Sequence, residues 1–345
     1  MPRLRLFLQL IAVGMVLVAA TLSAATAAPA AARTACTVTD HRVIGLSGLI
    51  VTDEGFDSIA DSNPDKSAIR VWLLNKACHV TGSISYPTSA YDPEDMALGR
   101  DGTIYVADIG DNNQARKTIA VWRIPPGSTH PHIYRYTYPD RAHDAEAMLL
   151  SADDAPIFVT KDVGIGEMFT PVGPGDPSGK PVKLRKVGAF DPPTTTTPNF
   201  LGFVGGMLVT GGANSRDRSM VALRTYADAY IWTVTGGDVV KAITTTKPRV
   251  LPLPNEPQGE SIALDPSGKH LYTVSDQEAE PVHTPILEYT LPSDPRASTA
   301  PSLTPRAAVS IAPRSNTWSY ALLIVVALLV AGVVLLTVRR RRTRS

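Results

Sequence analysis

The chain has 345 residues and a formal net charge of +1, from 33 Lys and Arg against 32 Asp and Glu. This balance excludes a strongly basic nucleic-acid binder, because such proteins carry a surplus of positive charge. The 25 glycines and 29 prolines, with 6% aromatic residues, favour many short strands and turns over a helical bundle.

Residues 1–32 have the three parts of a secretory signal peptide. Arg3 and Arg5 give a positive start, residues 6–20 form an uncharged apolar core, and residues 24–32 offer several small-x-small cleavage sites. An uncleaved anchor is the alternative, because no charge interrupts the segment after Arg5. Beyond the apolar core, however, the composition turns to Ala and Thr and loses the hydrophobicity of a membrane span. We therefore expect cleavage and export.

Cys36 and Cys78 are the only cysteines, and both follow the signal peptide. An even count in an oxidising compartment predicts one disulfide. It would close a loop of about 42 residues, which is worth roughly 3–4 kcal/mol in lost chain entropy of the unfolded state. Two free buried thiols are the alternative.

Residues 36–291 form the predicted globular ectodomain, and they contain an internal repeat. Each unit has a small or acidic opening residue, an apolar run, a polar turn, a β-rich strand and a charged residue. The opening residues are Ser47, Glu94, Glu146, Thr210 and Glu260. They are separated by 47, 52, 64 and 50 residues.

Three or four short strands in each interval is the spacing of a β-propeller blade. One blade cannot cover its own faces, so blades must stack around an axis. Five units are visible, and a sixth fits in the 64-residue interval or between the two ends of the domain. We therefore expect an all-β fold, a β-propeller, with six blades favoured over five. An irregular solenoid or sandwich is the alternative.

The C-terminal part predicts a membrane anchor. Residues 292–316 are rich in Pro, Ser, Thr and Ala and indicate an extended stalk. Residues 319–338 are an uncharged apolar run, long enough as a helix to cross the roughly 30 Å hydrocarbon core. The arginine-rich tail, residues 339–345, belongs on the cytoplasmic side. The expected protein is thus single-pass in the cell membrane, with a large extracytoplasmic domain.

The repeat also predicts a polar mouth. Opening residues and the ends of the second strands lie near one mouth of a propeller channel. The predicted ligand-binding residues there are Glu94, Asp108, Glu146, Lys161, Arg224, Glu260 and Asp276. Converging glutamates repel one another unless they are paired or bind a cation. Lys161 and Arg224 can supply that pairing in a structural ring, and Ca²⁺ is the alternative partner.

A calcium site would use Asp108, Asp111 and Glu146, since residues 108–113 are dense in side-chain oxygens. The segment lacks EF-hand spacing, so a cluster of Asx turns is the competing interpretation. His143 lies among carboxylates and is either a general base or a lone surface histidine. No Gly-x-Ser-x-Gly elbow and no phosphate-binding Walker loop occur.

Several motifs resemble those of a known group of proteins. The motifs are EDMA at 94–97, YVADIGDN at 105–112, DAEA at 144–147, LRTY at 223–226 and QGES at 258–261. They resemble secreted actinobacterial β-propellers, similar in outline to the esterase-like phytase and SdiA-regulated propeller groups. The resemblance implies a propeller, and some of those relatives bind calcium or hydrolyse phosphoesters. This sequence departs from the enzyme-like members because it lacks a dense cluster of histidine and aspartate.

The sequence therefore predicts a membrane-tethered extracytoplasmic β-propeller that binds a ligand or a protein partner and no nucleic acid. The alternative is a metal-assisted, Ca²⁺-type phosphoesterase or an esterase-like hydrolase, with carboxylates of the mouth holding the cation.

Overall fold

The computed structural model describes residues 32–60, 69–86, 90–128, 130–277 and 283–291. The predicted stalk, membrane span and arginine-rich tail lie outside these residues, as does the predicted signal peptide apart from Ala32. Within the described ranges, no helix is long and apolar enough to cross a membrane. The chain divides into two compact units, and all the described residues belong to the first, residues 1–293.

The described residues form 20 strands, which fall into five units of four. Units one and two contain β2 (Leu46–Val51), β3 (Gly55–Ala60), β4 (Ile69–Asn75) and β5 (Val80–Tyr86), then β6 (Pro93–Leu98), β7 (Ile104–Asp108), β8 (Ile119–Ile124) and β9 (His132–Thr137). Units three and four contain β10 (Ala145–Leu150), β11 (Pro156–Thr160), β12 (Gly166–Pro171) and β13 (Val182–Phe190), then β14 (Val209–Asn214), β15 (Met220–Thr225), β16 (Asp228–Thr233) and β17 (Arg249–Pro252). Unit five joins β18 (Gly259–Leu264), β19 (His270–Ser275) and β20 (Thr284–Thr290) to the N-terminal β1 (Arg33–Val38).

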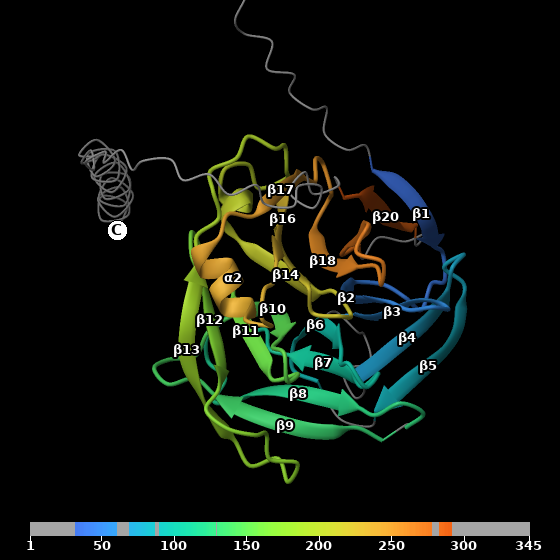
Figure 1. Ribbon diagram of the computed structural model, residues 1–345. Coiled ribbons are helices and arrows are strands. Elements are labelled where there is room, and N and C mark those ends of the chain that lie inside the picture. Colours follow the sequence, from blue (N-terminus) through green and yellow to red (C-terminus); the bar gives the residue numbers. More distant parts are fainter. Residues whose placement is uncertain (1–31, 61–68, 87–89, 129, 278–282, 292–345) are drawn as a thin grey trace, which may run out of the picture. The chain divides into compact units, whose positions relative to one another are not determined.

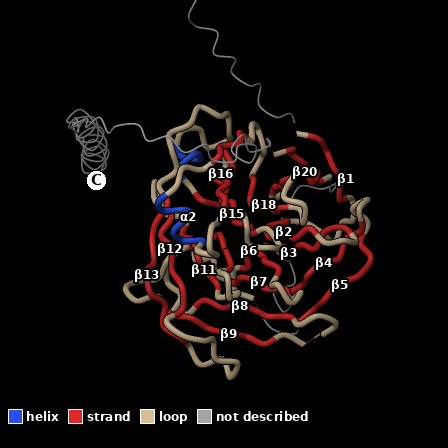
Figure 2. The backbone as a smooth tube through the Cα atoms, in the orientation of Figure 1, coloured by secondary structure: helices blue, strands red, loops and turns tan. Residues whose placement is uncertain are grey.

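The five units close into a ring. The first strands of the units, β2, β6, β10, β14 and β18, each contact the next, and β18 contacts β2. Figure 1 shows these strands gathered at the centre, with β5, β9 and β13 at the periphery. A short parallel pairing of β9 with β13 links units two and three at the outer edge. The arrangement is β-propeller-like, and it is all-β apart from two short helical segments (Figure 2).

The number of blades differs from the expectation of six. The 64-residue interval is filled by unit three and by residues 191–208, which contain no strand and end in a 3-10 helix, η1 (Val204–Met207). This segment carries three prolines and four consecutive threonines, and proline cannot donate to a strand ladder. The two ends of the domain share unit five instead of forming a sixth, so the prediction of six blades was wrong.

The predicted disulfide is confirmed and locks the ring closure. Cys36 lies on β1, the outer strand of unit five, and Cys78 lies in the turn between β4 and β5 of unit one. The bond therefore ties the two units between which the chain closes. Its sequence separation of 42 residues corresponds to a stabilisation of about 4 kcal/mol.

The hydrophobic core is divided among the contacts between blades. Five apolar clusters occur among the described residues, and each joins two neighbouring units. Strand β10 shows why its sequence is continuously apolar. Ala147 and Leu149 face unit four, whereas Met148 and Leu150 face unit two, because successive side chains point to opposite faces. A strand buried on both faces cannot alternate between apolar and polar residues.

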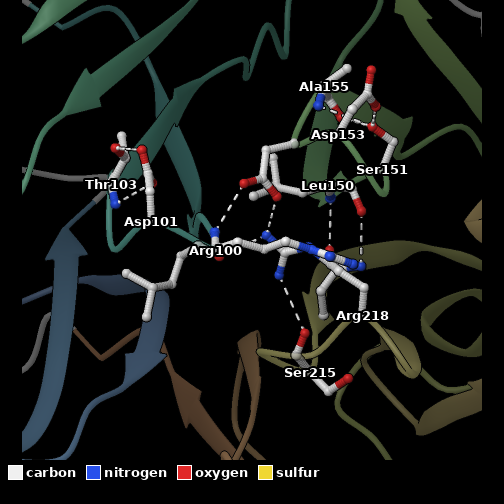
Figure 3. A network of polar contacts seen from close by, with 12 residues as sticks. Arg100, Asp101, Thr103, Leu150, Ser151, Asp153, Ala155, Ser215 and Arg218 are labelled. Carbon is white, nitrogen blue, oxygen red and sulfur yellow. Dashed lines mark hydrogen bonds and ion pairs between the residues drawn. The ribbon is translucent and has the colours of Figure 1, made fainter. Parts of the chain in front are cut away.

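Arg218 joins three units at the end of the ring where the first strands finish (Figure 3). Its side chain is 1% exposed, and its Nη2 lies 2.5 Å from Asp154 Oδ1 in unit three and donates to Leu98 O of unit two at 2.9 Å. Asp154 also accepts from the backbone N–H of Arg100 at 2.9 Å. This end is consequently held by a buried ionic network, whereas the predicted functional residues lie at the other end.

Candidate functional site

A β-bulge at the start of every first strand builds the candidate site. In each unit the pairing of the first and second strands shifts register beside the opening residue. A bulge leaves one residue unpaired and re-aims its side chain. The five residues, called here the bulge layer, are each at most 4% exposed: Ser47, Glu94, Glu146, Thr210 and Glu260. We call this end of the ring the mouth.

The two hydroxyl members of the bulge layer connect neighbouring units. Ser47 Oγ donates to Glu94 O at 2.5 Å, which joins units one and two. Thr210 Oγ1 donates to Gly259 O at 2.8 Å, which joins units four and five. Both hydroxyls are therefore engaged in hydrogen bonds between units. The three glutamates are the members of the bulge layer whose carboxylates can act on a ligand.

Two of the glutamates belong to one compact group, called here the mouth cluster: Glu146, Lys161, Tyr226 and Glu260. Lys161 Nζ lies 2.6 Å from Glu146 Oε1 and 5.3 Å from the centroid of the Tyr226 ring. Tyr226 Oη donates to Glu260 Oε1 at 3.1 Å. An ammonium group thus lies among two carboxylates and an aromatic face, both of which attract cations.

Burial controls the protonation of the mouth cluster. It raises the pKa of Glu146 well above its ordinary value; Lys161 opposes this rise, and the carboxylates of Glu260 and Asp144 add to it. Burial alone would lower the pKa of Lys161, but the charges of Glu146 and Glu260 outweigh it and raise that pKa. Burial and the Glu260 charge also raise the pKa of Tyr226. Lys161 therefore remains an ammonium at neutral pH, and Glu146 accepts a proton more readily than an exposed glutamate.

One atom of the mouth cluster lacks a partner. Glu260 Oε2 is buried and accepts no hydrogen bond from the described part of the chain. A buried polar atom without a partner costs about 1–3 kcal/mol, and more when the group is charged. This oxygen is the strongest candidate for contact with a ligand.

Glu94 lies under the loop that follows β7. A methyl group placed on Gly110 would lie 2.1 Å from Glu94 Oε1 and 2.6 Å from Asp92 Oδ2. Only glycine leaves room for the loop to pass this close to the two carboxylates. The loop therefore packs closely on the Glu94 carboxylate, whereas Glu146 and Glu260 both interact electrostatically with Lys161.

The floor of the mouth is Asp95, the residue after Glu94. It is 1% exposed, and its Oδ2 accepts the N–H of Met148 at 2.8 Å and of Gly212 at 3.2 Å, in units three and four. Burial raises its pKa well above the ordinary value, although these hydrogen bonds oppose the rise. Below the bulge layer, the Asp95 carboxylate of unit two is thus hydrogen-bonded to the backbones of units three and four.

The residues predicted to bind calcium have other partners. Asp108 accepts the N–H groups of Tyr91 and Asp92 and pairs with Arg116 at 2.9 Å. Asp111 accepts two further backbone N–H groups, from residues 115 and 116. Among the described residues, neither aspartate joins Glu146 in a group of potential ligand atoms. The geometry favours the Asx-turn interpretation of residues 108–113 over the calcium set.

Arg224 does not neutralise the bulge layer, contrary to the expected pairing with its glutamates. Its side chain is 0% exposed, and Nη1 lies 2.8 Å from Glu256 Oε2 and 3.1 Å from Ser261 O. Glu256 also accepts hydrogen bonds from the hydroxyls of Thr273 and Tyr289. The pair joins units four and five. Glu256 lies four residues before the opening residue Glu260, and the other four units have Val, Ala, Ala and Gly at that position. This single charged residue at that position of the repeat was a signal for the ion pair, and the sequence-based prediction did not use it.

Asp276 holds the loop that leads into β18. Gln258 Nε2 donates to Asp276 Oδ2 at 2.8 Å, and the backbone N–H of Asp276 donates to Gln258 O. Asp276 therefore lies at the mouth end but is engaged with the chain itself.

His143 is buried, which rules out the interpretation as a surface histidine. Its side chain is 0% exposed, and its ring nitrogens lie 3.0 Å from Asp140 Oδ1 and 3.6 Å from Asp162 Oδ2. Its ring packs against Tyr138 and Phe169. Asp140, His143 and Glu167 have ligand atoms close enough to hold a metal ion, although Glu167 is paired with Lys186. An adjacent cavity of about 170 Å³ is lined by Asp111, Arg116, Tyr138 and His143, among others.

No family model matches the chain, and no curated protein matches it. Some solved structures match the chain at low identity. Xanthomonas campestris gluconolactonase shares 12% identity over 79% of this chain and 94% of its own, with a TM-score of 0.44. Myxococcus xanthus glutaminyl cyclase shares 10% identity over 77% and 100%, with a TM-score of 0.44. A chain of a mitotic checkpoint complex shares 13% identity over 71% of this chain and 63% of its own, with a TM-score of 0.37. Identities this low say nothing of activity, and the resemblance to actinobacterial propellers stays a prediction.

Proposed function

We propose that the protein is a membrane-tethered, extracytoplasmic binding module whose ligand places a positively charged group in the mouth cluster. The observation that carries this proposal is the buried Glu260 Oε2, which lacks a hydrogen-bond donor in the described part of the chain. A ligand that supplies a donor recovers the cost of leaving that oxygen unpaired.

The charge of the site favours a cation. Within the mouth cluster, Glu146 and Glu260 carry two formal negative charges against the one positive charge of Lys161, which leaves an excess of one. The Tyr226 ring also attracts a cation through its face, as its contact with Lys161 illustrates. An organic ammonium and a hard divalent cation share this chemistry, and a titration with each probe separates them.

The test is a calorimetric titration of the full chain in lipid nanodiscs with spermidine and, separately, with CaCl₂, at low ionic strength. We expect one of the probes to bind and Glu260→Gln to weaken it at least tenfold, or about 1.4 kcal/mol. Asp176→Asn is the matched control, because Asp176 is a carboxylate in the loop between β12 and β13 at the opposite end. Absence of binding by both probes, or full affinity in the Glu260 variant, refutes the proposal.

A hydrolase is the second candidate, and the raised pKa of Glu146 favours it. A buried carboxyl whose pKa is raised by burial is suited to act as a general acid. Turnover of para-nitrophenyl phosphate or para-nitrophenyl acetate with CaCl₂, abolished in Glu146→Gln, would support hydrolysis. Equal background rates in the wild type and the variant would eliminate it.

A further inference from the structure

Two loops at the mouth expose apolar side chains. They are the loop between β11 and β12 and the segment between β13 and β14. Together they hold six of the nine large apolar side chains that are exposed in the described part of the chain, each between 41% and 67% exposed. These residues, called here the apolar rim, are Val163, Ile165, Phe200, Leu201, Phe203 and Val204.

The apolar rim is continuous with the mouth cluster. Phe200 packs against Tyr226 with ring centroids 4.9 Å apart, and the backbone N–H of Tyr226 donates to Gly205 O at 3.1 Å. Gly164 N–H donates to Met207 O at 3.2 Å, which joins the two loops. Tyr226 is therefore the shared wall between the rim and the carboxylates.

Exposure of this kind needs a reason. Apolar side chains scattered singly on a surface are normal, whereas a group of them beside a polar site marks an interaction surface. The three other exposed side chains, Tyr91, Val172 and Val250, lie in different parts of the chain. The rim is thus the main concentration of exposed apolar groups among the described residues.

We infer that the apolar rim and the mouth cluster form one docking surface for a protein partner that presents a lysine or arginine flanked by apolar side chains. This inference rests on the proposed function, because the basic side chain would enter the mouth cluster. The flanking side chains would pack on Phe200 and Phe203, and aromatic groups of this kind dominate the energy of protein interfaces. Complementary charge would set the register of the partner.

The charges around the rim favour this occupant over a lipid surface or a second copy. The segment 191–208 contains no lysine or arginine, and the adjacent cluster is acidic, so anionic headgroups would be repelled. A symmetric contact through this face of two copies would bring their two acidic clusters together. A basic partner segment would be attracted to the acidic cluster and would bring no second acidic cluster against it.

The test is selection from a phage-displayed library of 12-residue peptides on the full chain in nanodiscs, with empty nanodiscs subtracted. We expect enrichment of peptides that carry a lysine or arginine next to apolar residues. For a synthetic peptide from this set, Phe203→Ser and Glu260→Gln should each weaken the measured affinity at least tenfold. Val172→Ser is the matched control, since Val172 is 59% exposed at the opposite end of the ring.

Several outcomes overturn the inference. One is the absence of enriched peptides, and another is a set of binders that tolerate Phe203→Ser. Flotation with phosphatidylglycerol vesicles that Phe203→Ser abolishes would assign the rim to a lipid surface. A dimer in light scattering that Phe203→Ser dissociates would assign it to a second copy. If spermidine or CaCl₂ binds but no peptide does, the docking inference is refuted and the proposed function stands. If neither spermidine nor CaCl₂ binds the wild type, the proposed function itself is refuted.

Discussion

Replacing Arg224 by methionine is expected to destabilise the ring and to leave the mouth cluster intact. The guanidinium and its partner carboxylate on Glu256 are 0% and 1% exposed. Removing one member of such a pair leaves an uncompensated buried charge, which costs about 3–5 kcal/mol. Hydroxyl groups of Thr273 and Tyr289 still donate to the Glu256 carboxylate, at 2.7 and 2.8 Å. We therefore expect a loss near the lower limit, about 3 kcal/mol.

The double variant Arg224→Met with Glu256→Gln separates the ion pair from simple loss of packing. Neutralising the orphaned carboxylate should recover at least about 1 kcal/mol of the lost stability. Urea unfolding followed by tryptophan fluorescence measures both changes, because Trp232 is buried within unit four. Arg185→Met, at an exposed position on β13, is the matched control.

Two results would refute this account of Arg224. One is a loss below about 1 kcal/mol in the single variant, since a buried unpaired carboxylate must cost more. The other is a double variant no more stable than the single one. Loss of spermidine or Ca²⁺ binding in a fully folded Arg224→Met protein would return Arg224 to the ligand site.

Three further predictions test the closure, the electrostatics and the topology. Replacing Cys36 and Cys78 by alanine should lower the free energy of unfolding by about 4 kcal/mol in urea, and an unchanged midpoint would contradict the role of the bond in closing the ring. Burial raises the pKa of Asp57 from 3.8 to about 6, so the folded state binds a proton that the unfolded state releases, and stability falls as pH rises from about 4 to 6. Asp57→Asn should remove this dependence and add roughly 2–3 kcal/mol at pH 7, with little difference from wild type below pH 4, in unfolding curves recorded across that range. A chain ending at residue 291 should be secreted and soluble without detergent, with a β-rich circular dichroism spectrum; a product that needs lipid would contradict the proposed topology.

Much of the fold follows from local features of the sequence. The repeat located the start of every unit, because strand period, hairpin turns and opening residues recur at similar spacing. The same register placed Glu94, Glu146 and Glu260 in one layer, and an even cysteine count, together with the export expected from the N-terminal segment, predicted the Cys36–Cys78 disulfide. The prediction of six blades was wrong because the long interval between the third and fourth opening residues contains a proline-rich connection without strands. The length of an interval in a repeat does not show whether the extra residues form strands.

The partners of the charged residues were decided by the tertiary structure. The repeat predicted equivalent positions for Lys161 and Arg224, but the strand register separates them by two residues: Lys161 follows Thr160, the partner of Ala145, whereas Arg224 precedes Thr225, the partner of Val209. Lys161 accordingly pairs with Glu146 and Arg224 with Glu256. Spacing alone treated the two cations as equivalent, because it does not fix the register of the second strand against the first. Closure of the ring also brought Tyr226 between Glu260 and the exposed Phe200. The sequence by itself thus determined which side chains reach the mouth, and only packing between blades determined which are neutralised and which remain available to a ligand.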